Sequence, residues 1–248
     1  VGDRANNALR VNGQELRCKI IGEGGNLGCT QKGRIEYAKN GGRINTDAID
    51  NSAGVDCSDH EVNIKIAFSA DIASKKLTLE KRDALLASMT DEVAELVLKD
   101  NILQTQALSI EQARGVKLLD SQTRLIHELE KLGLLDRAIE FLPNDKQLAD
   151  LKIAGKGLTR PELAVLLSYS KMARYNSLLD SNLPDDEYFL NDLKKYFPKA
   201  MRAEFLSSIV NHQLKREIIA TVITNDIVNY AGTTFTFNMA LDLSVSMR

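Results

Sequence analysis

The chain has 248 residues, a hydrophobic fraction of 44% and a formal net charge of −2 at pH 7. This length accommodates one large domain or two smaller ones, each with its own core. The near-neutral charge gives no electrostatic case for binding nucleic acid or an anionic membrane surface. No apolar run reaches the roughly 18 residues of a membrane-spanning helix, and no signal peptide opens the sequence. We therefore expect a globular protein of the cytoplasm.

The three cysteines are odd in number and lack the spacing of a CxxC motif, at Cys18, Cys29 and Cys57. They predict neither a disulfide framework nor a zinc site, and reduced thiols explain them. The first residue is Val1 rather than methionine, and sheet-like sequence follows soon after, which suggests a piece of a longer protein.

A strand–helix–strand module occupies the N-terminal part. An apolar strand, Cys18–Ile21, breaks into the glycine-rich loop Gly22–Asn26, and a second strand, Arg43–Ile49, breaks into Asp50–Gly54. The helix-length segment Gln31–Lys39 lies between them, so the strands should be parallel neighbours joined by a right-handed crossover. Ligands of open parallel sheets bind outside the carboxyl ends of the strands, so both loops should meet at one site. The strands that would normally flank Cys18–Ile21 are absent from this sequence, so this strand should form an exposed apolar edge of the sheet.

Beyond the second strand the sequence predicts helices almost throughout. A helix should begin near residues 52–56 and bury a stripe of Val55, Val62, Ile66 and Ile72. Further helices are predicted over Leu79–Lys99, Ile102–Leu132, Pro161–Leu179 and Asn211–Tyr230. The first of these could restart at Thr90, and the second should end at Gly133. This part therefore indicates a helical bundle. The docking of the ending, Ala231–Arg248, is left open.

The first loop carries the candidate cofactor-binding residues Gly24, Gly25 and Asn26. Its glycine spacing does not fit the dinucleotide fingerprint GxGxxG, so we reject it as a pyrophosphate loop. The glycines would let the backbone approach a flat ligand, and Asn26 presents an amide that can donate and accept hydrogen bonds. A generic tight loop explains the same glycines.

Asn51 stands at the corresponding end of the second strand, twenty-five residues after Asn26. Two carboxamides in one crevice suit an amide-bearing ring such as nicotinamide. Ser58 lies two turns into the next helix, whose N-terminal end favours a carboxylate. The alternative is that Asn51 caps this helix and Ser58 is simply exposed.

The histidines and the clustered aspartates are interpreted as structural residues. The histidines are far apart in sequence, and a solvated or hydrogen-bonded role is the default for His60, His127 and His212. Four aspartates cluster without the spacing of a calcium loop, so cap or solvent roles suffice for Asp47, Asp50, Asp56 and Asp59. No metal site is predicted.

The segments GEGGNLG, TQKGRIEYA, GGRINTDAIDNSAGVDCSDHEVNIK and REIIATVITNDIVN resemble the C-terminal part of the large bacterial NAD-specific glutamate dehydrogenases. The loops at residues 22–26 and 51–58 also resemble, in register, the motifs A-E-G-A-N and N-A-G-G-V-x-x-S of the small glutamate dehydrogenases. This resemblance implies that Asn26 and Asn51 lie beside nicotinamide and substrate, and that Ser58 binds the side-chain carboxylate of glutamate. Ser52, Ala53, Asp59 and His60 depart from the small enzymes.

The resemblance also implies a fold class: an α/β remnant, the C-terminal strands of a Rossmann-type parallel sheet, followed by a mostly α-helical domain. The expected domains are 1–70, part of the NAD-binding domain, and 71–248, helical. The parent would be a homo-oligomer that oxidises L-glutamate to 2-oxoglutarate and ammonia with NAD. Its catalytic lysines and aspartate belong upstream, so no catalytic residue is predicted in this chain. The alternatives are a non-catalytic helical interaction or regulatory module and a different nicotinamide enzyme on the same fold.

Overall fold

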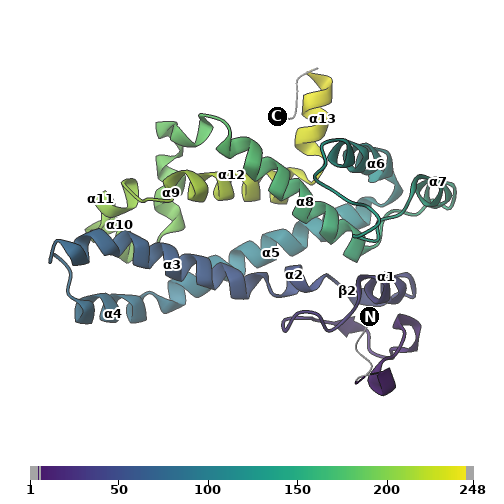
Figure 1. Cartoon of the computed structure of the whole chain (residues 1–248), viewed down its shortest axis with the longest axis horizontal. Coiled ribbons are helices and arrows are strands. Elements are labelled where there is room, and N and C mark those ends of the chain that lie inside the picture. The colour runs from purple at the N-terminus through teal and green to yellow at the C-terminus, as the bar shows by residue number, and fades with distance from the viewer. Residues whose placement is uncertain (1–4, 6, 244–248) are drawn as a thin grey trace. The chain divides into compact units, whose positions relative to one another are not determined.

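The computed structural model describes residues 5 and 7–243 and is predominantly helical (Figure 1). It divides into two compact units: residues 1–51 with 108–169, and residues 52–107 with 170–248. Each unit thus combines two separate stretches of sequence. The domain limits predicted for the parent, 1–70 and 71–248, stay a prediction.

The first unit contains the predicted strand–helix–strand module. Strands β1 (Ile20–Ile21) and β2 (Arg43–Ile44) pair in parallel, and α1 (Gln31–Lys39) connects them with the predicted bounds. Helix α1 begins where Thr30 Oγ1 accepts the Gly33 N–H over 3.1 Å. The parallel pairing is therefore confirmed, and so is the exposed edge, because the Ile20 side chain is 67% exposed.

The second strand is much shorter than predicted. The expected strand Arg43–Ile49 ends at Ile44, and α2 (Asp47–Asp50) replaces its second half. The backbone N–H groups of Ile49 and Asp50 both donate to the Thr46 carbonyl over 3.1 Å, which closes a helical turn. The alternation of apolar and polar residues concealed this helix start.

A second correction concerns the helix predicted over Ile102–Leu132. It is interrupted at Gly115, so that α5 (Thr90–Arg114) and α6 (Val116–Lys131) are separate helices. Gly115 has a φ of +51°, and a Cβ on Gly157 would lie 2.7 Å from the Gly115 carbonyl carbon. Both glycines are needed at this close backbone crossing. The predicted end at Gly133 is confirmed, with φ +69°.

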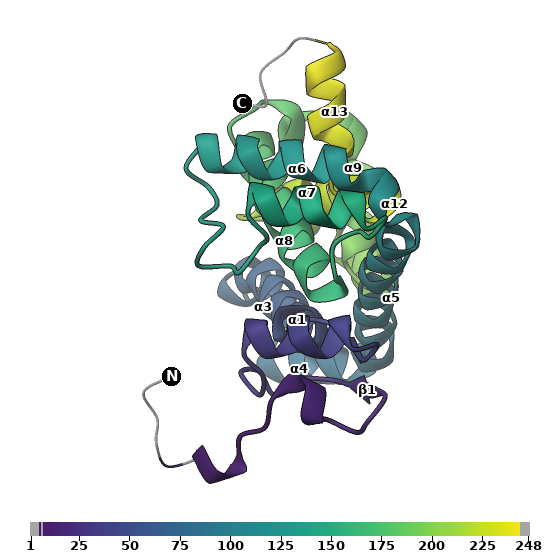
Figure 2. The ribbon, with the colours of Figure 1, turned by 90° about the vertical axis from the view of Figure 1, so that its right-hand side faces the viewer.

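The remaining helices of the first unit follow their capping signals. Helix α7 (Asp145–Ile153) starts after Asn144, whose side chain accepts the Gln147 N–H, and it lies beside α6 (Figure 2). Helix α8 (Arg160–Leu179) begins at the predicted capping box, where Glu162 accepts from the N–H and hydroxyl of Thr159. Short 3₁₀ turns at Asn7–Leu9 and Gly13–Glu15 precede the sheet.

The second unit is helical throughout its described residues. After α3 and α4 come the part of α5 up to Ala107, the second half of α8, two 3₁₀ turns and five more helices. The bounds are α3 (Ser52–Ala73), α4 (Leu79–Ser88), η3 (Leu183–Asp185), η4 (Glu187–Phe189), α9 (Leu190–Tyr196), α10 (Lys199–Glu204), α11 (Leu206–Val210), α12 (Lys215–Ala231) and α13 (Phe235–Asp242). The predicted restart at Thr90 is confirmed, because α4 ends just before it and α5 begins there. Helix α12 packs against α9 and α13.

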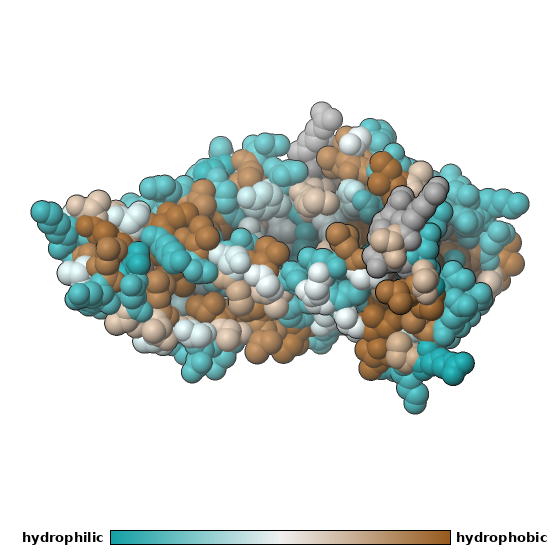
Figure 3. Space-filling model, turned by 60° about the horizontal axis from the view of Figure 1, so that its bottom comes forward, coloured by the Kyte–Doolittle hydropathy of each residue, from teal (hydrophilic) through white to brown (hydrophobic). Residues whose placement is uncertain are grey.

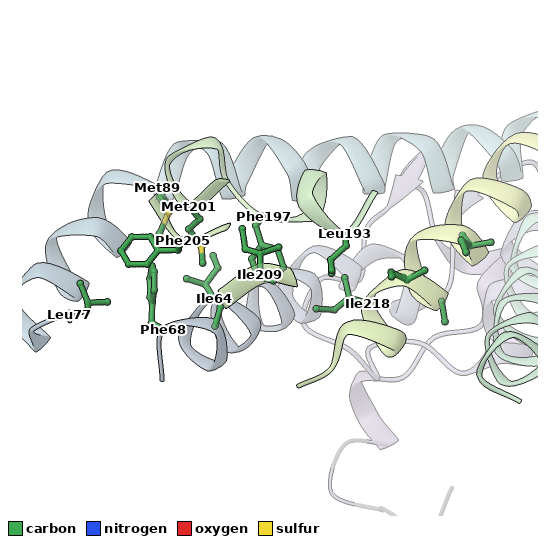
Figure 4. Close-up of a cluster of buried hydrophobic side chains, with 14 of the residues drawn as sticks. Ile64, Phe68, Leu77, Met89, Leu193, Phe197, Met201, Phe205, Ile209 and Ile218 are labelled. Carbon is green, nitrogen blue, oxygen red and sulfur yellow. The ribbon is translucent and has the colours of Figure 1, made fainter. Parts of the chain in front are cut away.

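The core of this unit joins α3 to the C-terminal helices (Figure 4). Phe68 and Phe197 are fully buried, and the Phe68 ring packs edge-on against Phe205 with centroids 4.9 Å apart. The predicted stripe of α3 is wrong at two positions, because Val55 and Val62 are 60% and 52% exposed. The buried face of α3 lies instead along Ile64, Ala67 and Phe68.

Apolar and polar residues are interspersed over the face in Figure 3. Among the described residues no helix combines the length and hydropathy required to span a bilayer. The ending whose docking the sequence left open forms α13 against α12. Residues 244–248 of that ending lie outside the described residues.

Candidate functional site

The loop that follows β1 is folded back onto α1 by a buried ion pair. The side chains of Glu23 and Arg34 are only 4% and 7% exposed, and Arg34 Nε and Nη2 donate to the Glu23 carboxylate over 2.6 and 2.9 Å. The Cys29 N–H, at the far end of the loop, donates to the same carboxylate over 2.8 Å. Burial is the largest influence and would lower the pKa of Arg34, but the bond to Glu23 together with the charges of Glu23 and Asp47 outweighs burial and raises this pKa. The charged pair therefore fixes both ends of the loop.

Two aspartates of α2 connect the end of the second strand to this loop. Asp50 Oδ2 accepts the Glu23 N–H over 2.8 Å, while Asp47 Oδ2 accepts the Leu27 N–H over 3.1 Å and lies 3.3 Å from Arg34 Nη2. Partial burial would raise the pKa of Asp47, but the Leu27 bond and the Arg34 charge overcome burial and lower it. The predicted cap and solvent roles are thus incomplete, since both carboxylates also hold the two loops together.

Asn51 joins the two loops directly. It caps the C-terminal end of α2, and its Nδ2 donates to the Gly24 carbonyl. Gly24 and Gly25 are exposed, and an added Cβ on either would meet no described atom within 4 Å. Asn26 is exposed with a φ of +59°, a left-handed conformation that Asn adopts more readily than most residues. The space beside these glycines is open, and their predicted role in binding a cofactor stays a prediction.

A hollow of about 660 Å³ opens at the ends of the two strands. Its lining includes Gly22, Asn45, Asp50 and Arg160, the first residue of α8. Arg160 Nε donates to Asn45 Oδ1, and Nη1 donates to Ser109 Oγ over 3.0 Å. Burial lowers the pKa of Arg160. The sequence offered no signal for this arginine, because over a hundred residues separate it from the strands.

Ser58 belongs to the second unit and lies on the solvent side of α3. Its hydroxyl donates to the Gly54 carbonyl over 3.1 Å, one turn earlier, and the side chain is exposed. Val55 and Val62, which share this side of the helix, are also exposed. The convergence of Ser58 with the two carboxamides stays a prediction.

The opposite side of α3 carries an ionisable cluster that sequence reasoning missed. Asp56 and His60 of α3 face Asp100 of α5, and each residue offers a ligand atom within 4.8 Å of the others. Lys171 of α8 interacts electrostatically with both aspartates, and its ammonium donates to Gln104 Oε1 over 2.8 Å. The three ligand atoms could in principle hold a metal ion. The ammonium already supplies a positive charge there, so the geometry requires no metal.

Burial controls the protonation of this cluster. It raises the pKa of Asp56 to about 6, aided by the charges of Asp100 and Asp59, and lowers that of Lys171 to about 8 against the pull of the two aspartates. Burial also lowers the pKa of His60 to about 4. The neutral imidazole stacks on the Tyr196 ring with centroids 4.3 Å apart. The expected structural role of His60 is therefore supported by its surroundings.

Two family models match this chain, and the regions that they match do not coincide with the two structural units. A model described as "Bacterial NAD-glutamate dehydrogenase, catalytic domain" matches residues 1–111, and one described as "Glutamate dehydrogenase, C-terminal" matches residues 155–248. The chain is 52% identical over 235 residues to an NAD-specific glutamate dehydrogenase of Pseudomonas aeruginosa, and 48% identical over 235 residues to one of Halomonas elongata. It is 47% identical over 246 residues to one of Mycobacterium tuberculosis.

These alignments cover 95%, 95% and 99% of the chain but only 14%, 15% and 15% of the relatives. The chain therefore spans about one seventh of the length of the curated relatives that it matches.

We predict that Glu23→Gln destabilises the first unit by about 3 kcal/mol, because it leaves the buried Arg34 without its charged partner. The free energy of unfolding in urea would measure this loss. Glu61→Gln is the matched control, since it breaks the exposed Glu61–Lys65 pair and should leave stability nearly unchanged. Equal effects of the two substitutions would contradict the anchoring role of Glu23.

The buried His60 predicts a defined acid sensitivity. Its pKa of about 4 in the fold lies below the ordinary value of 6.5, so its stabilising effect is complete above pH 6.5 and is lost as the pH falls towards 4. His60→Phe keeps a stacking ring without the titration. Between pH 7 and 4.5 the parent chain should lose about 2 to 3 kcal/mol more stability than this variant.

Asp56 acts with the opposite sign in the same range. Its pKa of about 6 in the fold is higher than the ordinary value of 3.8, so the folded chain binds a proton at Asp56 more readily than the unfolded chain does. Protonation of Asp56 therefore adds stability as the pH falls from 6 to 3.8. Because Asp56 is present in both chains, the comparison with His60→Phe largely cancels its contribution. Parallel stability profiles of the two chains across this range would refute the prediction.

Proposed function

Because the chain belongs to the bacterial NAD-specific glutamate dehydrogenase family, whose C-terminal part it matches, we propose that it forms one side of the nicotinamide and glutamate site of such an enzyme. The proposed reaction of the longer parent is the oxidative deamination of L-glutamate to 2-oxoglutarate and ammonia. NAD, when bound, would accept the hydride released from the α-carbon.

The observation that carries this proposal is the meeting of the two strand-end loops. Asn51 donates to the Gly24 carbonyl, while Gly24 and Gly25 leave open space beside them. A planar ring could lie against this backbone, with Asn26 free to hydrogen-bond to its carboxamide. These four residues fit the nicotinamide end of NAD by donor chemistry and by the space they leave. The ion pair below the loop would keep this surface preorganised.

Ser58 is proposed to bind the side-chain carboxylate of glutamate. Its hydroxyl is exposed two turns into α3 and can reach a ligand from the solvent side. The hydroxyl can donate to a carboxylate by leaving its bond to the Gly54 carbonyl. The exposed Val55 and Val62 would then contact the methylene groups of the substrate.

The proton-transfer groups are proposed to come from other parts of the parent. Asn26, Asn51 and Ser58 orient a cofactor and substrate, but none has a side chain suited to general acid–base catalysis at neutral pH. Lys171, whose lowered pKa would suit such a role, lies among Asp56, Asp100 and Gln104 within the helical unit. There it balances buried charge rather than serving Ser58, which lies on the opposite side of α3.

A homo-oligomeric parent acting in the cytoplasm on glutamate and 2-oxoglutarate is part of the same proposal. The alternative is that the chain serves only as a helical interaction or regulatory module. The helical unit has its own core around Phe68 and Phe197, which is compatible with either function. Substrate kinetics of the complete enzyme separate the two.

In the complete enzyme, Ser58→Ala is expected to raise the KM for glutamate much more than that for NAD. A lost charge-assisted hydrogen bond costs about 1.5 to 3 kcal/mol, which corresponds to roughly a tenfold to hundredfold increase. Ser69→Ala is the matched control, because Ser69 is exposed on the same helix and its hydroxyl likewise donates to a backbone carbonyl, that of Ile66. An unchanged glutamate KM in Ser58→Ala would favour the interaction module.

The purified 248-residue chain alone should have no glutamate dehydrogenase activity, since the proposed site residues Asn26, Asn51 and Ser58 can orient ligands but cannot move protons at the α-carbon. The measurement is NADH absorbance with saturating glutamate and NAD. The complete enzyme in the same assay is the positive control. Glutamate-dependent NADH formation by the isolated chain would overturn this part of the proposal.

A further inference from the structure

The first unit contains a second hollow, larger than the one at the strand ends. It has a volume of about 800 Å³ and opens between α1, α7 and the segment 137–143. Volumes of about 300 to 1,000 Å³ are typical of small-molecule sites. None of the proposed cofactor or substrate residues lines it, so its role does not depend on the proposed dehydrogenase site.

The floor of this hollow is apolar and its wall is strained. Ile35 and Leu142 of the lining are 8% and 6% exposed. Phe141 has a φ of +54°, a left-handed conformation that is a true outlier for a bulky residue. Its ring nevertheless stays 42% exposed, so deep burial of the ring does not account for the strain. Strain of this kind is concentrated at sites that bind ligands.

Three exposed lysines of the lining have no ion-pair partner among the described residues. They are Lys32, Lys39 and Lys156. The Lys32 ammonium lies 4.8 Å from the centroid of the Phe141 ring, which places a cation beside an aromatic surface.

The other charged groups of the hollow are largely engaged. Arg137 pairs with Glu130 and Asp145, while Glu36 accepts the Gly13 N–H over 2.9 Å. Glu162 accepts from Thr159 at the start of α8. Asp150 of α7 completes the charged lining, so three carboxylates share the hollow with the three lysines. The Lys32 ammonium, next to Phe141, forms no ion pair with any of them in the described part of the chain.

We propose that this hollow binds a small organic anion with a flat aromatic part. The aromatic part would stack on the Phe141 ring above the apolar floor, and the anionic group would meet Lys32, with Lys39 and Lys156 elsewhere on the lining. An apolar surface with a few convergent charged groups is the usual composition of such sites.

Titration of the 248-residue chain with 1-naphthyl phosphate, followed by calorimetry, tests this site. We expect saturable binding at one site, weakened at least tenfold by Phe141→Gly and by Lys32→Met. Lys146→Met is the matched control, because Lys146 is an exposed lysine of α7 that does not line the hollow, and it should leave the affinity unchanged. Inorganic phosphate should bind at least tenfold more weakly than the probe.

Absence of binding at millimolar probe, or equal binding of probe and inorganic phosphate, would overturn the proposal. Phe141→Gly also separates binding from folding. Glycine adopts a φ of +54° without strain, so the Tm of this variant should be equal to or higher than that of the parent chain while binding is lost. A lower Tm would mean that the Phe141 ring serves packing, and that also would overturn the proposal.

Discussion

The buried pair of Glu23 and Arg34 is the interaction on which the candidate site depends. Removing two charges from water costs several kcal/mol per ion, and such a pair persists only when its remaining hydrogen-bonding groups are satisfied. Here the Cys29 N–H completes the shell of Glu23, and Asp47 completes that of Arg34. The bonds span β1, α1 and α2, so one electrostatic arrangement fixes both strand-end loops. The open backbone at the glycines can therefore stay exposed without losing its shape.

Helix α3 separates two kinds of chemistry by its period of 3.6 residues. The side with Asp56 and His60 packs among charged and aromatic groups of the same unit, and continues into the core at Ile64 and Phe68. The side with Val55, Ser58 and Val62 stays exposed. Ser58 follows Asp56 by only two residues, yet the turn of the helix places Asp56 in the charged cluster and Ser58 at the solvent. This division leaves Ser58 available to a ligand while the helix itself is held in place.

The sequence predicted the elements whose signals are local, and failed where tertiary contacts decide. Helix α1 and the start of α8 are governed by caps within three residues, and both are confirmed. The break at Gly115 depends on the approach of Gly157, which no local pattern reveals. Val55 and Val62 fit an apolar stripe, but the core formed on the neighbouring side of the helix. The parallel strand order correctly predicted that the segments after β1 and β2 meet, but the predicted second loop, Asp50–Gly54, is helical on both sides of Asn51. Arg160 reached these segments from a helix far away in the sequence.

The cluster around Lys171 illustrates why a charge pattern in sequence does not identify a metal site. Asp56, His60 and Asp100 alone would resemble a ligand set, and the first two stand four residues apart on one helix. The cation that balances them comes from α8, more than seventy residues beyond Asp100. With the pKa of Asp56 near 6 and that of Lys171 near 8, the pair is predominantly ionised at pH 7. A metal ion held by these residues would be repelled by the charge of the Lys171 ammonium, so the internal cation disfavours an external one.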